Sequence, residues 1–201
     1  MISVMRKLLL LVLFLPVMVF AQTKQDLFYL IDKFPVNKSG DVNFCITDSI
    51  KNSSKGVIYI KAIQATDYSF KNAPSTTIPL YDDVNNIIIY KGKFIRIDRI
   101  QKTFSTVLNT YIYRFTIKIE CMDNAYKLSI YDISESEGDF TIMLSDLLKK
   151  EYYEKMTLSA GSLKAKYNSI LFIYNYLTSK IKSVREYMLK ENVQIKSKQP
   201  E

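Results

Sequence analysis

The chain has no histidine and no tryptophan, and it has only two cysteines. Without histidine it can form neither a Ser-His-Asp nor a Cys-His catalytic arrangement, nor a metal site with an imidazole ligand. The sequence also contains no glycine-rich phosphate loop and no nucleophile elbow. These absences exclude the commonest hydrolase, metalloenzyme and nucleotide-binding classes.

Aromatic residues are plentiful by contrast, with 15 Tyr and 11 Phe, and hydrophobic residues make up 48% of the chain. A composition of this kind argues against wholesale disorder. The length of 201 residues suffices for one domain with a proper core and an appendage.

Positive charge is in excess, with a formal net charge of +8. Residues 22–148 hold 15 Lys and Arg against 15 Asp and Glu, whereas residues 149–201 hold 11 against 5. The basic character therefore belongs to the C-terminal part. No basic stripe coincides with a nucleic-acid-binding motif, so no nucleic-acid partner is predicted.

Residues 1–21 have the pattern of a cleaved signal peptide. A basic pair, Arg6 and Lys7, precedes an apolar run, and small residues, Val19 and Ala21, precede the expected cleavage site. An uncleaved anchor is the weaker alternative, because the run is short and Pro16 interrupts it. No cysteine follows the cut, which disfavours a lipoprotein. We expect a periplasmic or extracellular protein.

Two β-hairpins are predicted between Thr76 and Ile133, with turns at residues 84–86 and 123–124 that are rich in Asp and Asn. Residues 111–121 alternate strictly, as in a strand with one face on a core and one in water. Gly92 predicts a bulge or a close backbone approach. Residues 99–107 and 134–139 are expected to be a polar connection and a loop.

Other elements flank these hairpins. A first strand is predicted within residues 41–49, and a helix from Ser53 or Ser54, as N-cap, to about Phe70. Beyond Ser145 a further helix is expected.

A long helix then follows from about Ser162 to Glu191, with apolar residues at alternating steps of four and three. We favour a helix lying across a sheet over a coiled-coil or partner-binding helix, with a C-terminal part that projects. The apolar positions are Leu163, Tyr167, Ile170, Tyr174, Leu177, Ile181, Val184 and Met188.

This order predicts an α+β fold, in which strand, helix, four strands and helix form an antiparallel sheet with helices on one face and a long C-terminal helix. The expected parts are a signal peptide (1–21), an α+β domain (22–140), a C-terminal helical region (141–192) and a flexible tail (193–201).

Several stretches resemble an uncharacterised secreted family, domain of unknown function 4468, which has a TATA-binding-protein-like (TBP-like) fold and is typical of Bacteroidota. They are FPVNKSGDVNF, SSKGVIYIKAI, YDDVNNIIIYKGKF and YRFTIKIECMDNAYKLSIYDI, within residues 34–132. Gly56 departs from the family pattern, and the C-terminal helical region is longer than the resemblance requires. The resemblance implies a TBP-like fold and export but no activity, and the fold name does not imply DNA binding.

Two small clusters predict no ligand site. Cys45 and Cys121 are expected to be separate thiols on the core side of two strands, with the last strand between them, although export would permit a disulfide. Asp82 and Asp83 with the following Asn residues lack the spacing of a Ca²⁺ loop and are interpreted as turn formers. We predict no cofactor and no metal.

The strongest functional hypothesis is a non-enzymatic binding or interaction module of the cell envelope, acting on an envelope protein, peptide or glycan. Its surface would be the sheet face away from the helices or the long helix. One alternative is a hydrolase-like enzyme that uses carboxylates near the second hairpin, namely Glu120, Asp123 and Asp132. Another is membrane-surface association through the basic C-terminal helix. The residues predicted on the open sheet face are Thr110, Ile112, Arg114, Thr116, Lys118, Lys127, Ser129 and Tyr131.

Overall fold

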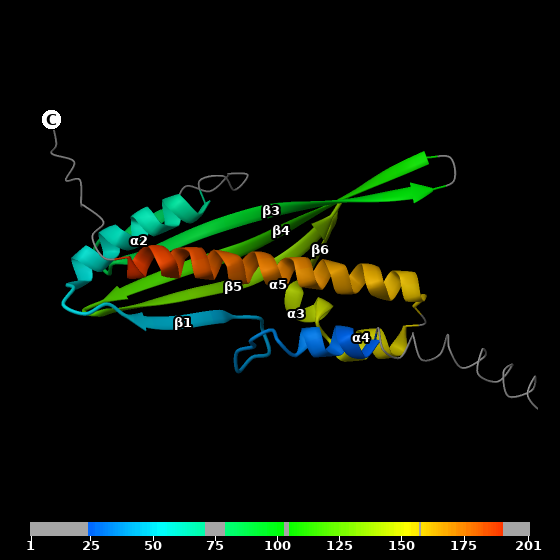
Figure 1. Ribbon diagram of the computed structural model, residues 1–201, viewed down its shortest axis with the longest axis horizontal. Helices are drawn as coiled ribbons and strands as arrows, with labels where there is room; N and C mark the ends of the chain where they lie inside the picture. The colour runs from blue at the N-terminus through cyan, green and yellow to red at the C-terminus, as the bar shows by residue number, and fades with distance from the viewer. Residues whose placement is uncertain (1–23, 71–78, 103–104, 157, 191–201) are drawn as a thin grey trace, which may run out of the picture. The chain divides into compact units, whose positions relative to one another are not determined.

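The computed structural model describes residues 24–70, 79–102, 105–156 and 158–190 (Figure 1). Within these residues six strands form one antiparallel sheet. The elements in chain order are β1 (Phe44–Ser49), α2 (Lys55–Phe70), β2 (Leu80–Asp82), β3 (Ile87–Lys102), β4 (Ser105–Met122), β5 (Ala125–Glu137), β6 (Phe140–Met143), α3 (Leu144–Leu147), α4 (Lys150–Lys155) and α5 (Ala160–Leu189).

The strands lie in the order β1-β5-β4-β3-β2, and β6 pairs with β5. Both predicted hairpins are confirmed, and Asn86 and Asn124 in their turns adopt positive φ, as Asn tolerates. The α+β class, the antiparallel sheet and the long C-terminal helix are confirmed as well. The helix expected to run to about Phe70 is α2, and the predicted leader (1–21) and tail (193–201) lie outside the described residues.

The described chain forms two compact units. One holds residues 24–35 and 146–176, and the other holds residues 36–145 and 177–190, so their boundary lies within α5. The sequence analysis expected the chain to divide once, near residue 140. Instead, one unit joins residues 24–35, which precede the sheet-forming segment, with residues 146–176, which follow it.

Two of the predicted loops are wrong. Residues 99–102 and 105–107 continue β3 and β4 as a paired ribbon, and residues 134–137 continue β5, which then pairs with β6. The composition of residues 134–137 indicated a loop, but these polar side chains find cross-strand partners: the Ser136 hydroxyl contacts Thr141 at 2.8 Å. Most of residues 140–143 were assigned to the predicted helical region (141–192). They form β6 instead, because they pair with this extension of β5.

A β-bulge interrupts the pairing of β4 with β5. Arg114 pairs with Ser134 and Thr116 pairs with Tyr131, so two residues of β5 face one residue of β4. Within the bulge Asp132 has a φ of 52°, in the left-handed region that Asp enters more readily than most residues. Ile133, the second residue of the bulge, is buried, while Ser134 and Ser136 align with the open-face positions of β4.

The core of the sheet unit lies between the helices and one face of the sheet. The alternation predicted for residues 111–121 is confirmed from Tyr113 onward: Tyr111 is partly covered, and the other residues on its face are buried, namely Tyr113, Phe115, Ile117, Ile119 and Cys121. The Phe115 ring lies against Gly92 of β3, where an added Cβ would come within 2.3 Å of a ring carbon. The prediction of a close backbone approach at Gly92 is therefore confirmed.

The second hairpin caps the first helix. The backbone amide of Lys55 donates to the Asp123 carboxylate at 2.8 Å, and the amide of Ser53 donates to the Asn124 side chain at 3.1 Å. The side-chain cap of α2 therefore comes from a turn that is distant in the sequence. Asp123 thereby fixes α2 to the end of β4.

The last part of α5, residues 177–189, packs within the sheet unit. Leu177, Val184 and Met188 are buried. Ser183 contacts Ser69 of α2 at 2.9 Å, and Arg185 donates to Asp48 of β1 at 2.9 and 3.0 Å. The prediction that this part of the helix projects is wrong, and packing across the sheet accounts for its apolar stripe.

In the other unit, Phe34 packs edge-on against Tyr174 of α5 with ring centroids 5.2 Å apart, and Lys150 of α4 forms an ion pair with Asp32. Tyr153 is buried and donates its hydroxyl to the Leu147 carbonyl at 2.6 Å. No helix among the described residues is both long and apolar enough to span a bilayer.

The two cysteines are free thiols. Strand β5 lies between β1 and β4, as expected. Cys121 is buried, but Cys45 is exposed, so the prediction that both thiols lie on the core side is wrong for Cys45. Burial raises the pKa of the Cys121 thiol to about 12.

Replacement of Gly92 by alanine should destabilise the fold, because the new methyl group would overlap the Phe115 ring. We expect Gly92→Ala to lower the free energy of unfolding by about 1–3 kcal/mol, measured by urea denaturation. Gly56 in α2 has open space around its Cβ position, so the control Gly56→Ala should leave stability unchanged or raise it by up to about 1 kcal/mol. Equal midpoints for Gly92→Ala and the parent chain would show that the contact is not tight.

The two thiols should differ in reactivity, because the thiolate is the reactive form. Cys121 is buried and its pKa is raised, so little of it is thiolate. Alkylation of the native protein at pH 8 should modify Cys45 at least about 100-fold faster than Cys121, as followed by mass spectrometry. Cys45→Ser should abolish the fast phase, and Cys121→Ser should retain it. Equal rates in the native state would contradict the assignment.

Candidate functional site

The sheet face away from α2 carries side chains in cross-strand rows that follow from the register. One row is Lys91, Thr116 and Tyr131, and the next is Lys93, Arg114 and Ser134. On the other side of the first row lies a row of Lys118, Ser129 and Cys45. In the first two rows β4 lies between β3 and β5, and in the third β5 lies between β4 and β1.

The eight residues predicted on this face differ in exposure. Thr110 and Arg114 are exposed, whereas Ile112, Lys118, Lys127 and Tyr131 are partly covered. Thr116 and Ser129 are only 6% exposed. The prediction that all eight side chains are open is thus wrong for these two, because short side chains in the middle strands lie beneath their longer neighbours.

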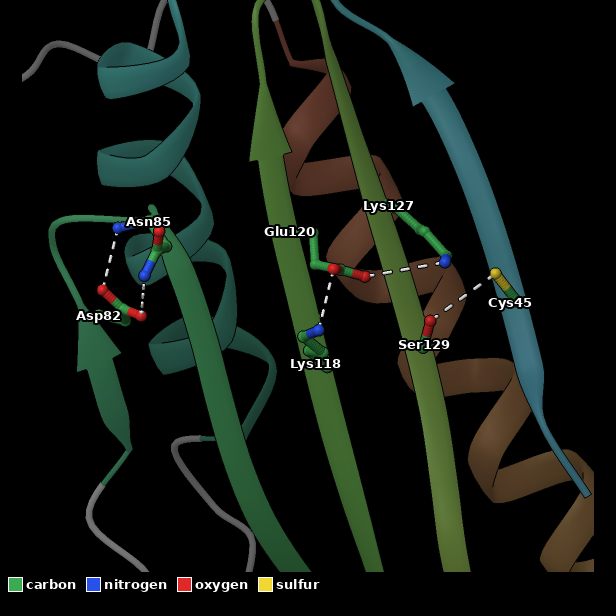
Figure 2. A network of polar contacts seen from close by, with 7 residues as sticks. All are labelled: Cys45, Asp82, Asn85, Lys118, Glu120, Lys127 and Ser129. Atoms are coloured by element: carbon green, nitrogen blue, oxygen red, sulfur yellow. Dashed lines mark hydrogen bonds and ion pairs between the residues drawn. The ribbon is translucent and has the colours of Figure 1, made fainter.

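Glu120 is held between two lysines on this face (Figure 2). Lys118 approaches one carboxylate oxygen at 2.9 Å and Lys127 approaches the other at 3.8 Å. The hydrogen bond from Lys118 is the main cause that lowers the pKa of Glu120. This carboxylate therefore stays ionised and ion-paired, which makes it a poor general acid.

A pocket of about 400 Å³ lies where the bulge meets the first two rows. Its lining combines residues from the middle of β3 and β4 with residues at the bulge of β5. The lining residues are Lys91, Gly92, Lys93, Arg114, Phe115, Thr116, Asp132 and Ser134.

Positive charge dominates this pocket. Lys91, Lys93 and Arg114 contribute three cations, and Asp132 contributes the one carboxylate of the lining. The Arg114 guanidinium donates to the Ser136 hydroxyl, which in turn contacts Thr141 of β6. A guanidinium carries five N–H donors, so an arginine held in this way can still present a forked pair to an anion.

The sequence predicted part of this site. Arg114 and Thr116 were placed on the open face, but Lys91, Lys93, Asp132 and Ser134 were not expected to join them. The two lysines flank Gly92, and the alternation of β3 alone puts both on one face. The contribution of Asp132 and Ser134 depends on the bulge, for which the sequence gives no clear indication.

The structure does not gather the carboxylates of the hydrolase hypothesis into this pocket. Of the three, Asp132 lines it, Asp123 caps α2, and Glu120 is paired with its lysines. Asp82 is a turn former, as expected, since it accepts from the Asn85 amide and side chain at 2.9 and 2.8 Å (Figure 2). Among the described residues, no three His, Cys, Asp or Glu side chains are grouped to hold a metal ion.

Comparisons with known proteins bear on the fold. No family model and no curated protein matches the sequence. A crystal structure of a DUF4468 family protein from Bacteroides ovatus is similar with a TM-score of 0.59 and 14% identity, covering 80% of this chain and 93% of that one. A TBP-like protein from Parabacteroides distasonis is similar with a TM-score of 0.50 and 15% identity, covering 75% of this chain and 96% of that one. The fold expected from the family resemblance is therefore confirmed: the chain has the fold of these TBP-like proteins.

Proposed function

We propose that this protein is a non-enzymatic binding module of the cell envelope that holds an anionic group of its partner in the pocket at the β5 bulge. The observation that carries the proposal is the grouping of three cations around one carboxylate in a pocket on the open sheet face. The leader predicted at residues 1–21 supports a place in the envelope.

Attraction to an anion follows from the charges and from their fixed positions. The pocket side chains sum to an excess of two positive charges when Lys91, Lys93 and Arg114 are set against Asp132. The three basic residues come from neighbouring strands with paired backbones, so only their side chains, and not the backbone, have to be ordered when a ligand binds. Hydrogen bonds to charged groups are the stronger ones, which favours a carboxylate or a phosphate.

Hydroxyl groups complete the set of donors. Thr116 and Ser134 line the pocket and are only 6% and 8% exposed. Asp132 can accept a hydrogen bond from a hydroxyl or amine beside the anion. One carboxylate in the lining provides no pair of acids for acid-base hydrolysis, which favours binding over that chemistry.

Titration with inorganic phosphate and with acetate, followed by amide chemical shifts, tests this proposal. We expect shifts at the pocket residues, and we expect Arg114→Gln to weaken phosphate binding about tenfold through loss of a charged hydrogen-bond donor. Raising the ionic strength should weaken binding as well, because part of the attraction is screened.

Lys127→Gln is the matched control, since Lys127 is a cation of the same face that pairs with Glu120 outside the pocket. It should leave phosphate binding within about twofold of the parent chain, in keeping with the small energies of exposed ion pairs. Equal effects of the two variants would show that only the general charge of the face matters. Absence of shifts at the pocket would refute the proposed function.

A further inference from the structure

An apolar strip adjoins the anion pocket on the same face of the sheet. Ile95 pairs with Ile112, and Ile97 pairs with Thr110, in the two rows that follow Lys93 and Arg114. Ile95 and Ile97 are 40% and 59% exposed, and Leu108, in the next row, is 59% exposed. Large apolar side chains that gather in the open commonly mark an interaction surface.

Ile97 and Leu108 lie on a two-stranded ribbon, and Ile95 lies just before it, in the row of Ile112 and Ser136. The pairing of β4 with β5 reaches only to Tyr111, whereas β3 and β4 remain paired beyond it, so the two continue as a ribbon (Figure 1). The opposite face of the ribbon carries the Arg96–Asp98 ion pair, at 2.7 Å, and Asn109, with Val107 in the row beyond. The strongly exposed Ile97 and Leu108 therefore lie on the face of the ribbon that continues the pocket side of the sheet.

Cations lie at both ends of the strip. Lys91, Lys93 and Arg114 are in the pocket at one end, and the exposed Arg99 pairs with Leu108 at the other. An apolar surface flanked by basic side chains complements the interface of an anionic bilayer, where phosphates lie just outside the acyl region. A neutral glycan would match the cations poorly and the isoleucines not at all.

We infer that the ribbon docks on a membrane surface that contains anionic phospholipid, with Ile95, Ile97 and Leu108 in the interfacial layer and a lipid phosphate in the pocket. This inference rests on the proposed function, because it assigns the source of the anion. The phosphate of the headgroup is held by Arg114 and the lysines, and the strip supplies the apolar contact that a soluble anion cannot make.

The ribbon is better suited to this role than the C-terminal helix. In α5 the apolar residues Leu177, Val184 and Met188 are buried in the sheet unit. Two of its cations serve internal contacts, since Arg185 pairs with Asp48 and Lys180 donates to the Ser69 carbonyl at 2.6 Å. The predicted membrane-surface association is thus proposed for a different part of the chain.

The absence of tryptophan from the sequence provides a site-specific reporter. In the mature protein, which begins after the predicted cleavage at Ala21, Ile97→Trp should show a blue shift of its emission on addition of phosphatidylcholine vesicles that contain phosphatidylglycerol. Brominated acyl chains should quench this emission. Val84→Trp is the control, because Val84 is 85% exposed in a turn away from the strip and its emission should not change. No shift for Ile97→Trp would refute insertion of the ribbon.

Vesicle flotation tests the apolar contribution. The variant Ile95→Ser with Ile97→Ser and Leu108→Ser should bind the anionic vesicles at least about tenfold more weakly, as expected when exposed apolar contacts are lost. It should retain phosphate binding and a cooperative thermal transition. The control is Val57→Ser with Ile60→Ser, which alters two residues of α2. Each is 40% exposed, as Ile95 is, and their replacement should leave vesicle binding unchanged.

Three results would count against this inference, and a fourth would count against the proposed function. Binding of phosphate without binding of anionic vesicles would overturn the bilayer inference and retain the pocket. Vesicle binding that survives the triple substitution would overturn the role of the strip. Crosslinking of the ribbon to an envelope protein, with no vesicle binding, would assign the surface to a protein partner and also overturn the bilayer inference. Failure of phosphate binding itself would overturn the proposed function.

Discussion

The contact of the Phe115 ring with Gly92 is the constraint on which both faces of the sheet depend. On the inner face this ring lies 6.1 Å from Phe70 of α2 and 5.9 Å from Phe94 of β3, measured between centroids. It therefore joins the helix to the two longest strands. On the outer face the same two residues are part of the pocket lining. Backbone pairing sets the spacing between the flanking lysines and Arg114, and the missing side chain at Gly92 lets the ring lie across β3 without disturbing that pairing.

Charge in this molecule has to be considered by location rather than as a sum. Residues 22–148, which supply the whole sheet, are neutral in total, yet the bulge gathers basic side chains locally. The C-terminal region carries the net positive charge, but part of it is used for internal contacts such as Arg185 with Asp48. A low total charge is therefore compatible with a strongly polarised surface, since neighbouring strands set which charges meet.

Local signals predicted the regular elements well. Asn86 and Asn124 specify turns through their own conformational preferences, and the alternation of β4 separates core from surface because side chains follow a period of two. The ribbon formed by residues 99–102 and 105–107, the extension of β5 and the cap from Asp123 were missed. Each depends on pairing with a distant segment, which polar composition hides. The pocket was predicted only in part for the same reason: Arg114 was on the expected face, but its partners depend on the register.

The bulge at Asp132 has a consequence for how such a chain can change over evolution. If β5 kept this residue but paired regularly with β4, without a bulge, the rest of the strand would turn over. Ser134 and Ser136 would then point into the core, and Ile133 would point to solvent. A substitution that accepts the left-handed backbone, such as Asp132 by asparagine or glycine, would leave every other side chain on its face. The bulge thus absorbs one extra residue of β5, and loss of that residue would leave Ile133 and Ser134 on their present faces.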